Sequence, residues 1–137
     1  MHLVVDMNIL FSFFKADSLM RKLLTNPSLE LYSPYRALDE ILEHSNEIMS
    51  KAKLKPEYFE TIKNALFLHV ELVPIQEFID LMEKAESVSP DEEDTAYFAL
   101  ALKHKCPIWS DDKRLKKQSI VRVYNTSEII RLLELLI

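Results

Sequence analysis

Residues 2–10 read HLVVDMNIL, a short hydrophobic run that ends at Asp6 and leads into a second hydrophobic segment. The β-branched residues of the run predict a strand from His2 to Val5, and the residues from Asn8 to Phe14 predict a helix. In an open α/β sheet, ligands bind beyond the carboxyl ends of the strands. Asp6 is therefore a candidate for a functional carboxylate at a strand end.

The same pattern recurs near the other end of the chain. Residues 107–110 read PIWS and predict a short buried strand, and Asp111 and Asp112 follow it directly. The carboxyl ends of parallel strands lie at one edge of a sheet. These two acids and Asp6 can therefore meet in space although they are far apart in the sequence.

Two further acids lie near predicted helix starts. Ser33-Pro34 predicts a helix with proline in its first turn, and Glu40 follows within about two turns. Residues 89–92, Ser-Pro-Asp-Glu, combine an N-terminal proline with a capping-box spacing. Asp94 therefore falls in the first or second turn of the next predicted helix.

Predicted strands alternate with predicted helices along the whole chain. We expect further strands over residues 29–32, 70–73 and 120–124, and further helices over residues 19–24 with Asp17 as cap, 56–68, 75–82 and 125–136 with Asn125 and Glu128 as a capping pair. This order predicts an α/β fold, a three-layer α/β/α sandwich with a mainly parallel central sheet. Because the chain has 137 residues, 48% of them hydrophobic, we expect a single domain over residues 1–137.

The composition excludes several kinds of site. The chain has no glycine, so it has neither a Gly-rich dinucleotide fingerprint nor a P-loop, and left-handed backbone positions must fall to residues such as Asn26, Lys105 or Asn125. Its one cysteine, Cys106, excludes an intrachain disulfide and a multi-cysteine zinc site. No apolar run approaches the about 20 residues of a membrane helix, and we find no signal peptide, so we expect a cytoplasmic protein without membrane contact.

Several acids in one place need a cation. Two unit charges about 4 Å apart repel by about 4 kcal/mol at an effective dielectric constant of about 20. Mg²⁺ and Mn²⁺ relieve this repulsion, prefer oxygen ligands and keep free positions for water or phosphate. The predicted ligands are Asp6, Glu40, Asp94 and Asp112, with Asp111 as a further candidate.

Four segments, spread over nearly the whole chain, resemble the motifs of the PIN-domain nucleases. They are VVDMNIL (residues 4–10), LDEIL (38–42), DTAYFALA (94–101) and IWSDD (108–112). The resemblance implies a compact α/β/α sandwich and an endoribonuclease activity that depends on Mg²⁺ or Mn²⁺. It assigns the acidic, catalytic positions to Asp6, Glu40, Asp94 and Asp112, and it assigns supporting polar roles to Asn8 and Ser110.

The resemblance implies two kinds of partner, RNA and protein. Many single-domain members of this length resemble VapC-type toxins, which pair with a small antitoxin and often form homodimers. The formal net charge of -5 does not favour RNA, but a local basic cluster does. We define this basic cluster as Lys113, Arg114, Lys116 and Lys117, which either binds RNA phosphates or forms an ordinary solvated face.

Two other functions are compatible with the same residues. The chain could keep the fold and act as a catalytically weak module that binds RNA or protein, in which case its acids would bind no divalent metal near millimolar concentration. It could also be a phosphohydrolase with an aspartate nucleophile, since Asp6 follows the first strand. Such enzymes resemble an Asp-x-Asp start, whereas this chain has Asp6-Met7-Asn8.

Overall fold

The computed structural model describes residues 1–15 and 18–135. Its elements, in chain order, are β1 (His2–Val5), α1 (Met7–Ser12), α2 (Ser18–Leu24), β2 (Glu30–Pro34), α3 (Arg36–Glu43), α4 (Ser45–Ala52), α5 (Pro56–His69), β3 (Val70–Val73), the 3-10 turns η1 (Ile75–Glu77) and η2 (Ile79–Leu81), α6 (Met82–Val88), η3 (Glu92–Asp94), α7 (Thr95–His104), β4 (Ile108–Trp109), η4 (Lys113–Lys117), β5 (Val123–Tyr124) and α8 (Thr126–Leu135). Asp17, the expected cap of α2, and Leu136 lie outside the described residues. None of the helices in this part of the chain has the length and apolar character that crossing a membrane requires.

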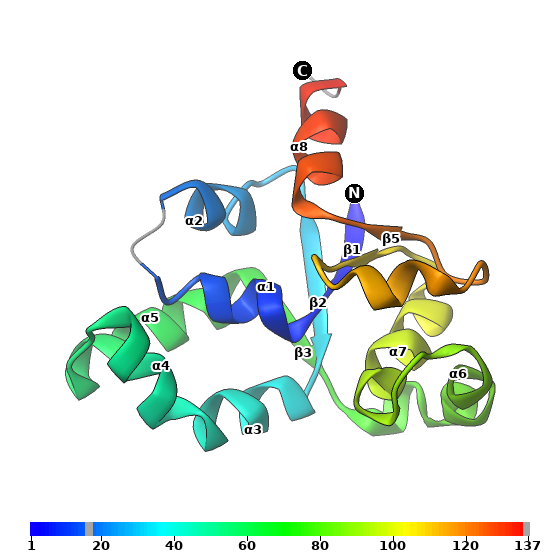
Figure 1. The fold of residues 1–137 in the computed structure, drawn as a ribbon, viewed down its shortest axis with the longest axis horizontal. Helices are drawn as coiled ribbons and strands as arrows, with labels where there is room; N and C mark the ends of the chain where they lie inside the picture. The colour runs from blue at the N-terminus through cyan, green and yellow to red at the C-terminus, as the bar shows by residue number, and fades with distance from the viewer. Residues whose placement is uncertain (16–17, 136–137) are drawn as a thin grey trace.

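The five strands form one sheet in the order β3-β2-β1-β4-β5, and every neighbouring pair is parallel. β1 lies in the middle, where Leu3 pairs with Leu31 of β2 and Val5 pairs with Trp109 of β4. Helices α1 to α5 lie on one side of this sheet and α6 and α7 on the other (Figure 1). The predicted α/β/α sandwich is confirmed, and the sheet is parallel throughout.

Alternating residues of β1 supply the two cores that hold the layers together. Leu3 and Val5 lie in the core that also contains buried residues of α1 to α5 and α8, whereas Val4 lies in the core formed with α7. A strand that is covered on both faces needs apolar side chains on both faces. Residues 3–5 are therefore all apolar. The polar residues that follow β1 and β4 consequently emerge at the edge of the sheet.

One predicted helix start is wrong. Pro34 is the last residue of β2, where it pairs with Val73 of β3, and α3 begins at Arg36. The backbone N–H of Tyr35 continues this strand pairing by donating to the carbonyl oxygen of Val73. Proline tolerates the end of a strand as well as the start of a helix, so the local signal alone does not separate the two.

Three other predicted boundaries also differ from the structure. Two 3-10 turns and α6 replace the helix expected over residues 75–82, because only Phe78 is deeply buried there while Ile75 and Ile79 are exposed. The last strand shrinks to Val123–Tyr124, because the Gln118 side chain bonds the backbone of residues 120 and 121 in a loop. The helix expected from Ser89 starts as η3 at Glu92, with Asp91 as its cap.

Lysine occupies the left-handed backbone positions of the described residues. Lys105 was expected there, but the second position is Lys53 and neither Asn26 nor Asn125 has a positive φ. Lys105 ends α7 with φ 52° and ψ 46°. A Cβ atom is disfavoured in this conformation by about 1 kcal/mol, whereas glycine adopts it freely.

Lys105→Gly is therefore expected to raise the free energy of unfolding by about 1 kcal/mol, measured by urea denaturation. The matched control is Lys84→Gly, because Lys84 lies on the exposed side of α6 and glycine inside a helix costs about 1 kcal/mol. A destabilised Lys105→Gly protein would mean that the left-handed position is not strained.

Candidate metal centre

Asp6 and Ser110 face each other across two neighbouring strands. Asp6 follows β1 and Ser110 follows β4, and the register of these strands places the two residues side by side. The Ser110 hydroxyl donates to Asp6 Oδ2 at 2.6 Å. The backbone N–H of Met7 donates to the other oxygen, Oδ1, at 2.9 Å, so Asp6 also caps α1. The carboxylate is therefore held in one orientation.

Asn8 and Ser110 connect Asp6 with the acids after β4. Asn8 Nδ2 lies 3.1 Å from Asp6 Oδ2 and 3.3 Å from Ser110 Oγ, and it donates to both. The backbone N–H of Asp112 donates to Ser110 Oγ at 3.1 Å. Asn8 Oδ1 accepts from the backbone N–H of Asp111 at 3.4 Å. The two polar residues singled out from the sequence thus form a network that fixes the backbone after β4 relative to Asp6.

Asp6 is nearly inaccessible to solvent, with 5% of its surface exposed. Burial raises the pKa of Asp6, and the negative charge of Asp112 raises it further, while the hydrogen bonds from Ser110 and Met7 act in the opposite direction. A buried carboxylate with another carboxylate beside it disfavours its own charged form. A nearby cation would stabilise the charged form of the Asp6 carboxylate.

Asp94 is exposed to the negative charges of Asp6 and Asp112, which act on its own carboxylate. It immediately precedes α7, and burial together with the charges of Asp6, Asp112 and Asp91 raises its pKa to about 6. Its Oδ2 atom is buried and has no hydrogen-bond partner in the described part of the chain. An unpaired buried carboxylate oxygen is costly, so a ligand for it is expected.

Tyr97 was not singled out from the sequence as a site residue, because it lies in the strongly apolar stretch of α7. Its hydroxyl is buried and lacks a hydrogen-bond partner among residues 1–15 and 18–135. Burial raises the pKa of Tyr97, and the charges of Glu40, Asp6 and Asp94 contribute in the same direction. The only sequence signal was its position, three residues after Asp94 and one turn along α7.

Glu40 is the acid of the set that lies on α3. Burial raises the pKa of Glu40, and the charges of Asp6 and Glu93 add to this, while Arg36 opposes it. Arg36 Nε donates to Glu40 Oε1 at 3.0 Å, four residues earlier on the same helix. The four acids lie in one electrostatic neighbourhood. The charge of Asp6 raises the pKa of both Glu40 and Asp94, and the charge of Asp112 raises the pKa of both Asp6 and Asp94.

Arg114 holds the fourth acid. Its Nε lies 3.2 Å from both carboxylate oxygens of Asp112, its Nη2 lies 2.8 Å from Oδ2, and its backbone N–H donates to Oδ1 at 3.0 Å. These hydrogen bonds keep the pKa of Asp112 below its ordinary value. The guanidinium also lies 3.9 Å from Asp91. Two of the acids, Glu40 and Asp112, are therefore already paired with positively charged side chains, Arg36 and Arg114.

The fit of this site to a divalent ion is mixed. Carboxylate oxygens are the ligands that Mg²⁺ and Mn²⁺ prefer, and the buried unpaired oxygen of Asp94 favours a cation. However, no three His, Cys, Asp or Glu side chains of the described ranges stand together as a ready-made ligand set. The shared negative field still favours a cation, because Arg36 and Arg114 are largely exposed and their pairs with Glu40 and Asp112 can rearrange.

The carboxylate of Asp111 binds the start of α8 and, in the described part of the chain, makes no hydrogen bond with the other acids. Its Oδ1 accepts from the backbone N–H of Thr126 at 2.7 Å, and its Oδ2 accepts from the Thr126 hydroxyl at 2.8 Å. Both oxygens thus bind the start of α8. Asn125 and Glu128 cap the same helix reciprocally, as expected from the sequence, through hydrogen bonds of 3.0 and 2.9 Å.

The basic cluster lies on η4, directly after Asp112. Arg114 pairs with Asp112, and Lys116 pairs with Glu128. Lys113 and Lys117 are exposed and form no ion pair with any described residue. Only half of the cluster is therefore available for phosphate without breaking an existing pair.

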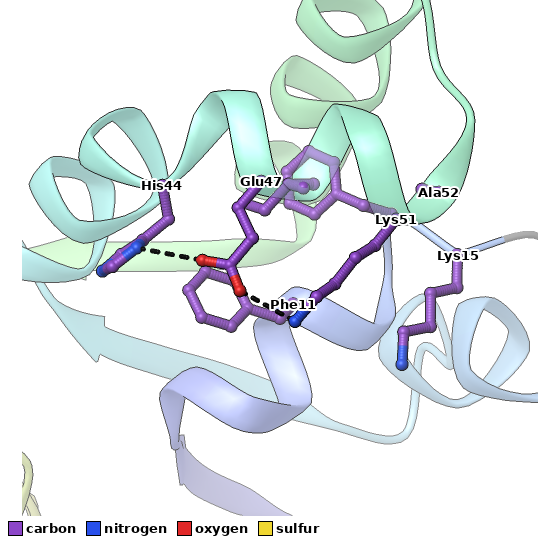
Figure 2. A pocket seen from close by; sticks show the side chains of 8 residues that line it. Phe11, Lys15, His44, Glu47, Lys51 and Ala52 are labelled. Carbon is purple, nitrogen blue, oxygen red and sulfur yellow. Dashed lines mark hydrogen bonds and ion pairs between the residues drawn. The ribbon is translucent and has the colours of Figure 1, made fainter.

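A separate cavity of about 150 Å³ lies between α1 and α4 (Figure 2). Phe11, Phe14 and Ile48 give it an apolar lining. Glu47 lies at its rim between Lys51, at 2.7 Å, and His44, at 3.5 Å. None of the four acids lines this cavity, so it is not part of the candidate metal centre.

Comparisons with known proteins bear on the family and the fold of this chain. Residues 4–130 match a family model described as PIN domain. Among solved structures, the fold is similar to the crystal structure of VapBC2 from Rickettsia felis bound to a DNA fragment from their promoter, with a TM-score of 0.64 and 14% sequence identity over 91% of this chain and 98% of that chain. At this identity the likeness concerns the fold. The search of curated proteins finds no match.

Proposed function

Because the chain belongs to the PIN domain family, whose members are generally nucleases that use divalent metal ions, we propose that it is a Mg²⁺- or Mn²⁺-dependent endoribonuclease. The observation that carries this proposal is the shared negative field of Asp6, Glu40, Asp94 and Asp112, with one buried oxygen of Asp94 left unpaired. These four residues would hold the metal. The ion supplies Lewis-acid chemistry, since it polarises a phosphodiester and lowers the pKa of water.

The other polar residues of the site orient the four acids and bind the substrate. Ser110 and Asn8 hold the Asp6 carboxylate in place, and Ser110 also fixes the backbone of Asp112. Arg36 and Arg114 lie beside the acids and carry the fork-shaped donors that suit phosphate oxygens. Lys113 and Lys117 extend this positive surface along η4, where they would contact the RNA backbone.

The test is an RNA cleavage assay with Mg²⁺, with Mn²⁺ and with EDTA. The wild-type protein is expected to cleave with either metal and to stop in EDTA. Asp6→Asn is expected to cleave about 100-fold more slowly, since it removes a charge from the site while keeping a side chain of the same shape. Circular dichroism must show that this variant is folded. Equal cleavage by the two proteins would point to a contaminating nuclease and against the proposal.

We further propose that the protein partner is a small antitoxin. The support is the fold similarity to VapBC2 together with the sequence resemblance to VapC-type toxins. A purified antitoxin that binds the chain would be expected to suppress RNA cleavage in the same assay. A partner that binds firmly without any effect on cleavage would contradict the toxin assignment while leaving the nuclease proposal intact.

The alternative, a binding module with little turnover, has one structural observation in its favour. Glu40 and Asp112 already have arginine partners within the chain, and no ready-made ligand set exists among residues 1–15 and 18–135. This alternative predicts that the protein binds no divalent metal near millimolar concentration. The aspartate-nucleophile alternative has less support, because the position two residues after Asp6 is Asn8, which is bound to Asp6 and Ser110.

A further inference from the structure

A second cavity lies beside the metal centre, at the carboxyl ends of β2 and β3. Its volume is about 320 Å³, within the range of about 300–1,000 Å³ that small-molecule sites occupy. Tyr35 forms one wall directly after β2, Ile75 forms another after β3, and Ala96 of α7 also lines it. β2 and β3 end, and α7 begins, at the sheet edge that carries the acids, so the cavity and the candidate metal centre belong to one surface.

Two lining residues connect this cavity, which we call the Tyr35 pocket, to the acids. Arg36 lines the Tyr35 pocket and donates to Glu40 Oε1 at 3.0 Å. Ala96 follows Asp94 by two residues at the start of α7. A strand of RNA whose phosphate lies at the acids would therefore place a neighbouring nucleotide at the Tyr35 pocket, with Arg36 between the two.

The exposed side chains of the Tyr35 pocket match a flat ligand with apolar faces and polar edges. Tyr35 is 50% exposed and Ile75 is 43% exposed, so both side chains present apolar surface that a ligand in the cavity can contact. Every nucleobase has a π-face that stacks on aromatic rings, and such stacking stabilises binding by about 1–3 kcal/mol per base. Tyrosine is thus a suitable platform for an unpaired base of single-stranded RNA.

Asp39 supplies a specific polar edge. It is exposed on α3, it lines the Tyr35 pocket, and its carboxylate has no hydrogen-bond or ion-pair partner in the described part of the chain. A carboxylate only accepts hydrogen bonds, so it selects a base edge with donors. Guanine presents two adjacent donors, N1–H and the N2 amino group, to one carboxylate. Gln76 also lines the pocket, and its side-chain amide can donate a hydrogen bond to a base or accept one from it.

We propose that the Tyr35 pocket binds the nucleobase next to the cleaved phosphate, with a preference for guanine, through stacking on Tyr35 and hydrogen bonds to Asp39. This inference rests on the proposed function, because it requires RNA at the acids. It adds a base-specific subsite to a centre that otherwise recognises only phosphate. The subsite determines where the RNA is cut.

The test measures binding of a labelled single-stranded oligoribonucleotide in EDTA and low salt, so that no metal or cleavage is involved. Tyr35→Ala is expected to bind about 5-fold or more weakly, whereas Tyr35→Phe keeps the ring and binds like the wild-type protein. The matched control is Tyr58→Ala on α5, because Tyr58 is 59% exposed and does not line the Tyr35 pocket. Asp39→Asn is expected to lose the difference between an oligonucleotide with guanine and one with inosine, which lacks the N2 amino group.

Cleavage mapping with Mn²⁺ separates this inference from the proposed function. The inference is wrong if Tyr35→Ala binds and cuts RNA like the wild-type protein at the same positions, and the nuclease proposal would then survive. If the wild-type protein neither binds nor cleaves RNA, both are wrong. If Tyr35→Ala changes the oligomeric state in ultracentrifugation without changing RNA binding, the Tyr35 pocket is a contact between copies of the chain, and the inference is again wrong.

Discussion

Asp94→Asn is expected to reduce metal-dependent RNA cleavage by about 100-fold or more, because it removes a charge from the centre of the acid set. Asp94 is the residue whose titration both Asp6 and Asp112 affect, and its Oδ2 atom is the unpaired oxygen of the site. The measurement is the initial rate of cleavage at saturating Mn²⁺. The matched control is Asp80→Asn, because Asp80 is an exposed aspartate that pairs with Lys103 on another part of the surface.

The same variant is expected to be more stable than the wild-type protein in EDTA at neutral pH. The pKa of Asp94 is about 6 in the folded protein and 3.8 ordinarily, so the stability that protonated Asp94 contributes is complete below about pH 4 and is lost by about pH 6. The carboxylate is only partly buried, so solvent screening limits the change to about 1 kcal/mol. Urea denaturation at pH 4 and at pH 7 measures it.

A loss of activity together with a gain of stability would show that Asp94 is kept for function. If Asp94→Asn were instead less stable than the wild-type protein at pH 7, the carboxylate would have a structural partner that these contacts do not include. If it cleaved RNA as fast as Asp80→Asn, Asp94 would not belong to the catalytic set. The two measurements are independent, because urea denaturation requires no metal and the cleavage assay requires no denaturant.

Trp109→Ala is expected to lower the free energy of unfolding by about 3–5 kcal/mol. Trp109 is fully buried in the core shared by β1, α1 and α8, and its Nε1 donates to the Thr126 hydroxyl at 3.1 Å. Truncation leaves a large cavity and removes a bond that helps to fix the start of α8. Because Ser110 follows Trp109 directly, the site and the core depend on the same short strand.

Trp109→Phe separates the two contributions. Phenylalanine keeps most of the buried apolar surface and loses the bond to Thr126, so a loss of about 1 kcal/mol is expected. Both values come from urea denaturation at one pH in EDTA. A loss below about 1 kcal/mol for Trp109→Ala would mean that β4 is not a central strand of a packed core, which would contradict the described sheet order.

The sequence predicted the central features of the fold because they depend on local patterns. A hydrophobic run followed by an acid occurs twice, and the structure places these runs as the adjacent strands β1 and β4. The alternation of strands and helices correctly indicated a parallel sheet covered on both faces. These features need only the short-range periodicity of side chains and the handedness of parallel connections.

The incorrect boundaries depend on particular contacts that residue propensities do not describe. Pro34 fits either a helix start or a strand end, and its pairing with Val73 decides between them. Gln118 uses its side chain to hold residues 120 and 121 out of the sheet, which no propensity describes. The hydrogen bonds of Asp111 to Thr126, fifteen positions later in the chain, likewise do not follow from local sequence patterns.

Sequence position singled out the acids of the candidate site, whereas it did not indicate their arginine partners. Asp6 and Asp94 stood out by their positions at a strand end and a helix start, and the structure places both in one negative field. The sequence placed Arg114 in a basic cluster, and the structure shows that its guanidinium binds Asp112. Long flexible side chains choose partners by tertiary geometry, so their pairing does not follow from sequence spacing alone.

The most direct test of the account is a calorimetric titration of Mn²⁺ into the wild-type protein and into Asp94→Asn. The wild-type protein is expected to bind Mn²⁺ below millimolar concentration, and Asp94→Asn is expected to bind it at least about tenfold more weakly. The absence of binding by the wild-type protein near millimolar concentration, or equal binding by both proteins, would contradict the assignment of these acids to a metal centre.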